Sequence, residues 1–214
     1  MTVSTDPTPK AERSRNPRGQ GSRLRDEILD AAESLLADGE PVTLRSIARR
    51  AGIAAPSIYR HYPDVDSIMA TVAERAFAQL AAHLSAGPVG VGPEDRVHAI
   101  AERYLSYAQD HPEHYRLMFG GVWNAAAALA QHPEQAERLN ALGSDTMAVL
   151  VDAIETCVTA GVSLSNDPYR DAVALWVALD GLAHQRRVAP LFAWPPALPR
   201  TIVTALARLR ADPA

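Results

Sequence analysis

The chain has 214 residues and a formal net charge of −4, and 47% of its residues are hydrophobic. This composition is typical of a globular protein and excludes a largely disordered one. No stretch approaches the roughly 20 uninterrupted apolar residues that a membrane helix needs, so we expect no contact with a membrane. The single cysteine, Cys157, cannot form an internal disulfide, and a reducing cytoplasm is therefore the expected compartment.

The charge is unevenly distributed along the chain. Residues 1–62 carry a net charge of +2, whereas the remainder carries a net charge of −6. Residues 1–21 are basic and rich in Pro, Ser, Thr and Gly, and we predict that they form a disordered arm. A basic end on an acidic body suits a protein that touches phosphate at one end only.

The first predicted helix begins at Ser22 and closes at Asp38-Gly39. The next stretch, TLRSIARRAGIAAPSIYRHY over 43–62, is typical of two short helices joined by a tight turn. Ala48 is small where the helices cross, Gly52 permits the positive φ of the turn, and Ile58 is apolar where the second helix packs back. This is the pattern of a helix-turn-helix, whose second helix lies in the DNA major groove. An ordinary αα-hairpin is the alternative, but the outward-facing residues suit DNA.

A long helix is predicted over 65–84, and it is long enough to leave the head and enter a second unit. Further helical stretches are predicted near 94–110, 112–120, 134–160, 168–188 and 198–210, with breaks at proline and glycine. No alternating strand pattern is present. The sequence therefore predicts an all-α fold with a head over 22–67 and a helical body over 68–214, joined by a fourth helix that continues to about residue 85.

Residues 24–80 resemble the tetracycline-repressor (TetR) family of bacterial regulators. The stretch LRSIARRAGIAAPSIYRHYPDVDSI follows that family's head motif. The resemblance implies a DNA-binding regulator whose divergent helical body binds a small molecule and dimerises. Two positions depart from the pattern. Ala54 stands where many relatives have a Ser or Thr cap, and Val65 stands where many have a phosphate-contacting Lys.

Candidate DNA contacts lie on the second helix of this motif and at the start of the first. They are Thr43, Arg45, Ala55, Pro56, Ser57, Tyr59, Arg60 and His61. The apolar pair that opens the second helix suits thymine methyl groups, and Arg60 suits guanine or phosphate. Ser57 and Tyr59 are expected to contact phosphate. Thr43 and Arg45 open a helix where free N–H groups favour phosphate.

Candidate ligand-binding residues lie in the body, where aromatic residues recur at helical spacing. They are Tyr104, Tyr107, Phe119, Trp123, Trp176 and Asp180. Aromatic rings with a few polar tips suit a pocket for a small, largely apolar ligand. Ordinary core packing is the alternative for each of them.

A homodimer is expected, because two recognition helices read a palindromic double-stranded DNA operator with far greater discrimination than one. In similar proteins the last two long helices form the dimer, which here are 169–188 and 198–210. The candidate seam comprises Leu175, Leu179, Leu182, Ile202, Leu206 and Leu209.

Enzymatic signals are weak. His111-x-x-His114 supplies half of a metal site, but no Cys or carboxylate pattern completes it, and no Gly-rich phosphate loop is present. We therefore expect neither enzymatic activity nor a metal or other cofactor.

The predicted function is a repressor that a small-molecule effector releases from its operator. A same-fold regulator that activates transcription or senses no small molecule is the leading alternative, and a helical enzyme or carrier is another. A filled body core would favour the constitutive regulator, and a body cavity would favour the sensor.

Overall fold

A computed structural model describes residues 20–87 and 90–210, so the predicted arm lies outside the described residues up to residue 19. The helices are α1 (Gln20–Ala37), α2 (Leu44–Arg50), α3 (Ala55–Ile58), α4 (Val65–Ser85), α5 (Pro93–Asp110), α6 (Pro112–Phe119), α7 (Ala125–Gln131), the 3-10 helix η1 (Pro133–Gln135), α8 (Ala136–Asn140), α9 (Ser144–Thr159), α10 (Pro168–Val188) and α11 (Leu198–Leu206). The all-α prediction is confirmed. Within the described ranges the only β pairing is an isolated bridge between Ser163 and Leu209.

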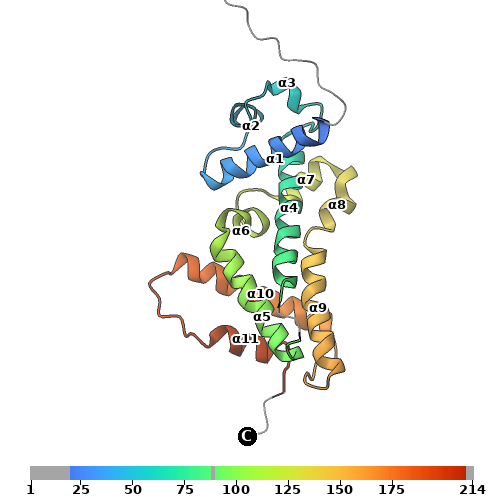
Figure 1. The fold of residues 1–214 in the computed structure, drawn as a ribbon, viewed down its shortest axis with the longest axis vertical. Coiled ribbons are helices and arrows are strands. Elements are labelled where there is room, and N and C mark those ends of the chain that lie inside the picture. Colours follow the sequence, from blue (N-terminus) through green and yellow to red (C-terminus); the bar gives the residue numbers. More distant parts are fainter. Residues whose placement is uncertain (1–19, 88–89, 211–214) are drawn as a thin grey trace, which may run out of the picture.

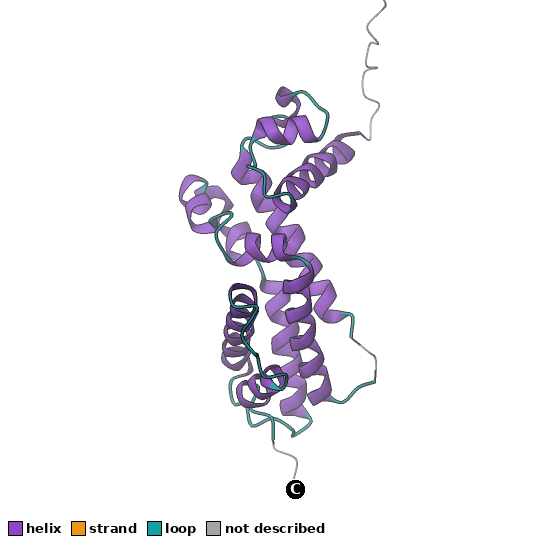
Figure 2. Cartoon of the chain, turned by 90° about the vertical axis from the view of Figure 1, so that its left-hand side faces the viewer, coloured by secondary structure: helices purple, strands orange, loops and turns teal. Residues whose placement is uncertain are grey.

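The molecule consists of a small head and a larger body, which α4 connects without interruption (Figure 1). In the head, α1 packs against α4, α2 packs against α1, and α3 packs against α2. In the body, α5 and α9 pack against α4, while α10 packs against α5 and α9, and α11 packs against α5 and α10. The view turned by 90° shows the same elongated arrangement, again wholly helical in the described residues (Figure 2). No described helix is both long and apolar enough to cross a membrane.

The helix-turn-helix follows from local chemistry at its ends. The hydroxyl of Thr43 accepts a hydrogen bond from the Ser46 backbone N–H at 3.0 Å, and Ser46 Oγ accepts one from the Thr43 N–H at 2.8 Å. This capping box starts α2. Gly52 has a φ of 64°, as the turn requires, and Ala48 and Ile58 are buried where the helices meet.

The recognition helix α3 is short and poorly capped. It has four residues, and Ala54 at its N-cap makes no side-chain hydrogen bond. Asp64 then starts α4 by accepting a hydrogen bond from the Ser67 N–H at 2.7 Å. Tertiary packing of Ile58 and Tyr62 into the head core, rather than helix propensity, therefore holds α3 in place.

The prediction of one helix over 134–160 is wrong. That region contains η1, α8 and α9, and α7 precedes them. Gly143 breaks the run with a φ of 80°, and a Cβ there would lie 3.0 Å from the Phe77 ring. Asn124 starts α7, because its Oδ1 accepts a hydrogen bond from the Ala127 N–H at 3.0 Å.

The last helix is also shorter than predicted, since α11 ends at Leu206. Arg208 then adopts a positive φ of 50°. The chain turns to pair with the segment after α9, where the Leu164 N–H donates to the Arg208 carbonyl at 2.9 Å and the Arg210 N–H donates to the Val162 carbonyl at 2.9 Å.

The predicted dimer seam on α10 is wrong. Leu175 and Leu179 are fully buried and Leu182 is 5% exposed, all within the core of the single chain. The exposed apolar residues of α10 instead include Tyr169, Val177 and Val188, at 64%, 57% and 56%. The helix is apolar on two sides, so helical periodicity alone did not identify the outer one.

Candidate DNA-binding surface and ligand cavity

The predicted DNA contacts lie together on the head, at the end of the molecule farthest from α11 (Figure 1). Tyr59 is 60% exposed although it adjoins fully buried Ile58. Pro56 and Arg60 are also exposed, whereas Ser57 and His61 are half-buried. The α3 segment thus buries Ile58 in the head core and leaves Tyr59 and Arg60 exposed.

The remaining candidates flank this segment. Ala55 is half-buried and packs against the head core. Thr43 and Arg45 are exposed at the start of α2, with the Thr43 hydroxyl engaged in the capping box. Which of these residues touch DNA stays a prediction.

The cations of the head divide into paired and unpaired groups. Arg49 Nη2 lies 3.5 Å from Glu40 Oε2, and Arg50 lies 2.6 Å from Asp38 and 2.8 Å from Glu40. Arg45 and Arg60 make no ion pair with any described residue. The structure therefore leaves positive charge available at the two places where the sequence predicts phosphate or base contacts.

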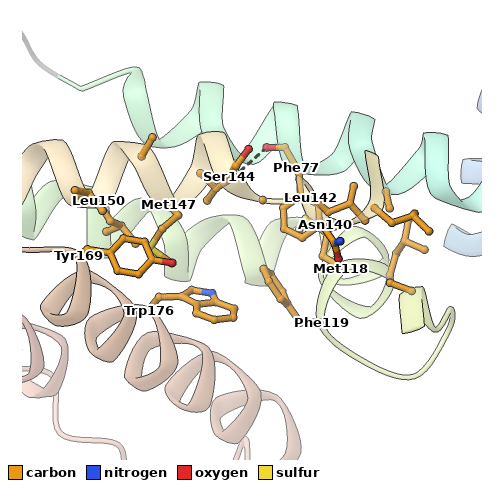
Figure 3. A pocket seen from close by; sticks show the side chains of 18 of the residues that line it. Phe77, Met118, Phe119, Asn140, Leu142, Ser144, Met147, Leu150, Tyr169 and Trp176 are labelled. Carbon is orange, nitrogen blue, oxygen red and sulfur yellow. Dashed lines mark hydrogen bonds between the residues drawn. The ribbon is translucent and has the colours of Figure 1, made fainter. Parts of the chain in front are cut away.

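The body contains a cavity of about 830 Å³ between α4, α6, α9, α10 and the segment that joins α6 to α9. Its residues are Ala73, Phe77, Leu117, Met118, Phe119, Trp123, Ala125, Leu139, Asn140, Leu142, Gly143, Ser144, Thr146, Met147, Ala148, Leu150, Val151, Asp152, Glu155, Tyr169 and Trp176. Figure 3 shows Tyr169 and Trp176 extending from α10 towards Met147 of α9, with Phe119 beside Trp176. The ring centroids of Phe119 and Trp176 are 5.9 Å apart.

The interior of this cavity is apolar, and its charged groups lie at the rim. Asp152, Glu155 and Tyr169 are exposed. Arg96 Nη2 neutralises Asp152 at 2.6 Å. Trp123 also lines the cavity, and its Nε1 is buried without a hydrogen-bond partner among the described residues.

The structure brings only part of the predicted ligand set to this cavity. Phe119, Trp123 and Trp176 line it, but Tyr104, Tyr107 and Asp180 do not. The sequence pattern did not single out Phe77 on α4 or the α9 residues. Only their apolar helical spacing could have indicated them, and core residues share that spacing.

The residues that do not line the cavity form buried polar networks. The hydroxyl of Tyr104 donates to Asp180 Oδ1 at 3.2 Å, and the hydroxyl of Tyr115 lies 2.5 Å from the same oxygen. Burial and the Asp180 carboxylate raise the pKa of Tyr104 far above its ordinary value, so this phenol remains a donor. Burial similarly raises the pKa of Tyr107 to about 12.

One wall of the cavity belongs to the head as well. Leu117 is buried in the head core, Trp123 packs against that core, and Ala73 of α4 is one of its members. All three also line the cavity. The same three residues therefore contribute to the cavity wall and to the packing of the head.

Two family models match the chain. The model described as "Bacterial regulatory proteins, tetR family" matches residues 28–77, and the model described as "Tetracyclin repressor-like, C-terminal domain" matches residues 97–209. The head and body described above thus define a helix-turn-helix regulatory protein. The chain belongs to the tetracycline-repressor family.

Individual relatives agree with this assignment. Uncharacterized HTH-type transcriptional regulators from Mycobacterium tuberculosis and Mycobacterium bovis are 51% identical over 47 residues, which is 21% of this chain and a quarter of each relative's length. A protein of unknown function from Rhodococcus sp. RHA1 is 28% identical, with a TM-score of 0.68 over 90% of this chain and 95% of that one. The fatty acid degradation regulator FadR from Bacillus halodurans shares the fold, with 14% identity and a TM-score of 0.65 over 92% of this chain and 100% of that one.

Proposed function

We propose that this chain is a homodimeric transcriptional repressor in the cytoplasm that binds a palindromic operator through its head. A small, largely apolar effector binds in the body cavity and releases the protein from DNA. The observation that carries the proposal is the wall that the cavity and the head core share, at Leu117 and Trp123. A cavity of about 830 Å³ falls within the range of small-molecule sites, which favours a sensor over a constitutive regulator.

The proposed mechanism is a shift between two arrangements of the head relative to the body. An effector that contacts Trp123 and the end of α6 stabilises the arrangement in which the two heads of a dimer no longer match the operator spacing. A tenfold loss of operator affinity requires about 1.4 kcal/mol of differential binding. Burial of a few apolar groups of the effector, at roughly 25 cal/mol per Å², is enough to supply that difference.

DNA binding is tested with a palindromic operator selected from random duplexes. We expect Arg45→Ala and Arg60→Ala to weaken binding and to flatten the slope of log affinity against log salt by about 1 for each phosphate that is no longer neutralised. Arg49→Ala is the matched control, because Glu40 already neutralises Arg49 in the same head. Equal losses of affinity in all three variants would show that the unpaired cations have no special role.

Effector binding is tested with N-phenylnaphthylamine, a neutral aromatic probe whose fluorescence rises when it leaves water. We expect saturable binding in the parent protein and a loss of at least tenfold in affinity in Trp176→Ala. Trp194→Ala is the control, because Trp194 lies outside the cavity and donates to the Ala189 carbonyl at 3.2 Å. Operator binding without probe should be unchanged in Trp176→Ala. Probe binding that survives in Trp176→Ala but fails in Trp194→Ala would place the site elsewhere.

A further inference from the structure

The break between α5 and α6 gathers three potential metal ligands. His111 follows the last residue of α5 and is also the N-cap of α6, and Glu113 and His114 lie in the first turn of α6. One potential ligand atom from each of the three lies within 4.8 Å of the others. Glu113 lies between the two histidines in the sequence, and in the folded chain its carboxylate is the third potential ligand.

The hydrogen bonds of His114 determine which of its ring nitrogens is available. Its Nδ1 lies 3.0 Å from the hydroxyl oxygen of Tyr107, and the same hydroxyl lies 3.3 Å from the carbonyl oxygen of Ala76. A carbonyl can only accept, so the arrangement that makes both contacts hydrogen bonds directs the single phenolic proton to Ala76 and has His114 Nδ1–H donate to Tyr107. His114 Nε2 then carries the free lone pair. Metal-binding histidines in proteins are commonly oriented by such an outer hydrogen bond.

The cluster is held together on one side and open on the other. His114 is 8% exposed, whereas the side chain of His111 is 44% exposed and gives an ion access from solvent. The rings of His111 and Tyr107 are 4.6 Å apart between centroids, and those of His111 and His114 are 5.5 Å apart. His111 Nδ1 lies 3.9 Å from Glu113 Oε1.

We propose that His111, Glu113 and His114 bind a divalent transition-metal ion of the zinc class. Two imidazoles and one carboxylate are a donor set that suits Zn²⁺, Co²⁺ and Ni²⁺, whereas Ca²⁺ and Mg²⁺ prefer oxygen ligands. Ligand atoms of a tetrahedral ion are about 3.3 Å apart, so the partly exposed side chains of His111 and Glu113 must rotate to bind it. His111 must then leave its stack on His114, where the two ring planes lie at 14°, because an imidazole binds a metal through a lone pair in its ring plane. Water completes the fourth position.

The proposed metal site lies next to the head and outside the proposed effector cavity. Glu113 borders a small crevice, together with Leu36 and Glu40 of the head. Four residues after Glu113 on α6, Leu117 is buried in the head core. A metal ion would therefore fix the α5–α6 break at the point where the body meets the head, independently of any ligand in the cavity.

The test uses the full chain after treatment with a chelator. Titration with Co²⁺ should produce the ligand-field absorption of a four-coordinate ion, saturating at one equivalent per chain, and Zn²⁺ should abolish that absorption. We expect His111→Ala, Glu113→Gln and His114→Ala each to lower Co²⁺ affinity at least tenfold. Tyr107→Phe removes the acceptor that orients His114, and we expect a loss of roughly 10-fold to 100-fold.

His184→Ala is the matched control, because His184 is exposed on α10 and outside the cluster. Circular dichroism at each titration point separates lost binding from lost structure, and Glu113→Gln preserves the size of the side chain should a histidine variant fail to fold. The proposal is overturned if the parent shows no saturable Co²⁺ absorption, or if Glu113→Gln and His111→Ala bind as the parent does. Loss of the absorption in His184→Ala would equally overturn it.

Discussion

Asp180 illustrates how one charged residue is accommodated inside an apolar helical body. Its carboxylate accepts hydrogen bonds from the hydroxyl groups of Tyr104 and Tyr115, which come from α5 and α6. The network joins three helices at one atom. A buried acceptor of this kind stabilises the fold only while its donors remain in place, because unpaired buried hydroxyl groups are costly.

We expect Asp180→Ala to lower the free energy of unfolding by about 1–3 kcal/mol, because it leaves the buried phenol of Tyr104 without its acceptor, whereas Tyr115 also donates to the backbone carbonyl of residue 180 at 3.0 Å and keeps that bond. Urea unfolding followed by circular dichroism measures the change. Gln185→Ala is the control on the same helix, since Gln185 is exposed, and it should shift the free energy by less than about 0.5 kcal/mol. Similar losses of stability in both variants would contradict a special role for the carboxylate.

A second buried group, His98, makes stability depend on pH. Burial, followed by repulsion from Arg200, lowers the pKa of His98 below its ordinary value of 6.5, although Asp95, Glu102 and Glu94 oppose the shift. Above pH 6.5 the folded and unfolded chains both hold a neutral imidazole. As the pH falls below 6.5, His98 is protonated in the unfolded chain before it is protonated in the folded chain. We therefore expect the free energy of unfolding to decrease as the pH falls below 6.5.

Urea unfolding at a series of pH values between about 7.5 and 5 measures this slope. His98→Leu should make the slope shallower without abolishing it, because burial lowers the pKa of His114 in the same direction. An unchanged slope in His98→Leu would show that His98 is not desolvated in the folded chain. His184→Leu, at an exposed position, should retain the parent slope.

At the scale of elements, α4 connects the head to the body, and contacts from two side chains attach α7 and α8 to it. His132, at the end of α7, lies 3.0 Å from Asp64, the residue that caps α4. On α8, Arg138 donates through Nη2 to Glu74 and to Thr71 at 2.7 Å each, both on α4. The segment that covers one side of the cavity is therefore attached to the helix that carries the head.

We expect Arg138→Met to destabilise the protein by about 1–2 kcal/mol, because the guanidinium binds both carboxylate oxygens of Glu74 in a half-buried site. Arg23→Met is the matched control. Arg23 pairs with Glu27 on the surface of α1, and such exposed pairs contribute less than about 1 kcal/mol. Thermal or urea unfolding compares the two, and equal effects would argue against an anchoring role for Arg138.

The elements with strong local signals were predictable from the sequence. The helix-turn-helix follows from Thr43, Gly52 and Ile58, and the long α4 follows from its Asp64 cap and its apolar period. The break at Gly143 was not predictable in this way, because a glycine within a helical pattern carries no local sign that a neighbouring ring will require it.

The cavity was predictable only in part, because helical periodicity assigns a residue to a face and not to a neighbour. Tyr104 and Tyr107 share a face of α5, yet they face Asp180 and His114 rather than the cavity. Which helix packs across from a given face depends on tertiary packing, and no single sequence encodes that in a local pattern.

At the scale of the whole molecule, exposed apolar residues gather along the outer side of α10 and the loop that follows it. Val177 and Val188 are half exposed, Leu191 is 99% exposed and Phe192 is 59% exposed. A single soluble chain rarely leaves such a series in water. We expect a second copy of the chain to cover it in the homodimer proposed above.

Val177→Asp should therefore convert the dimer to a monomer, because it places an unpaired charge in the expected interface. Sedimentation velocity measures the change. Gln79→Asp, on the exposed side of α4, is the control and should remain dimeric. A Val177→Asp variant that sediments as the parent does would move the interface away from this side of α10.

Leu117 and Trp123 line the cavity and also pack in the head core, and this limits how this regulator can be recombined with its relatives. A chimera that joins this head to a foreign body after α4 would lose the Leu117 side chain, and a missing buried leucine costs about 2–5 kcal/mol. The exchangeable unit therefore comprises the head, α4 and the α6 segment through Trp123. Designers of hybrid biosensors would need to transplant that discontinuous unit as a whole.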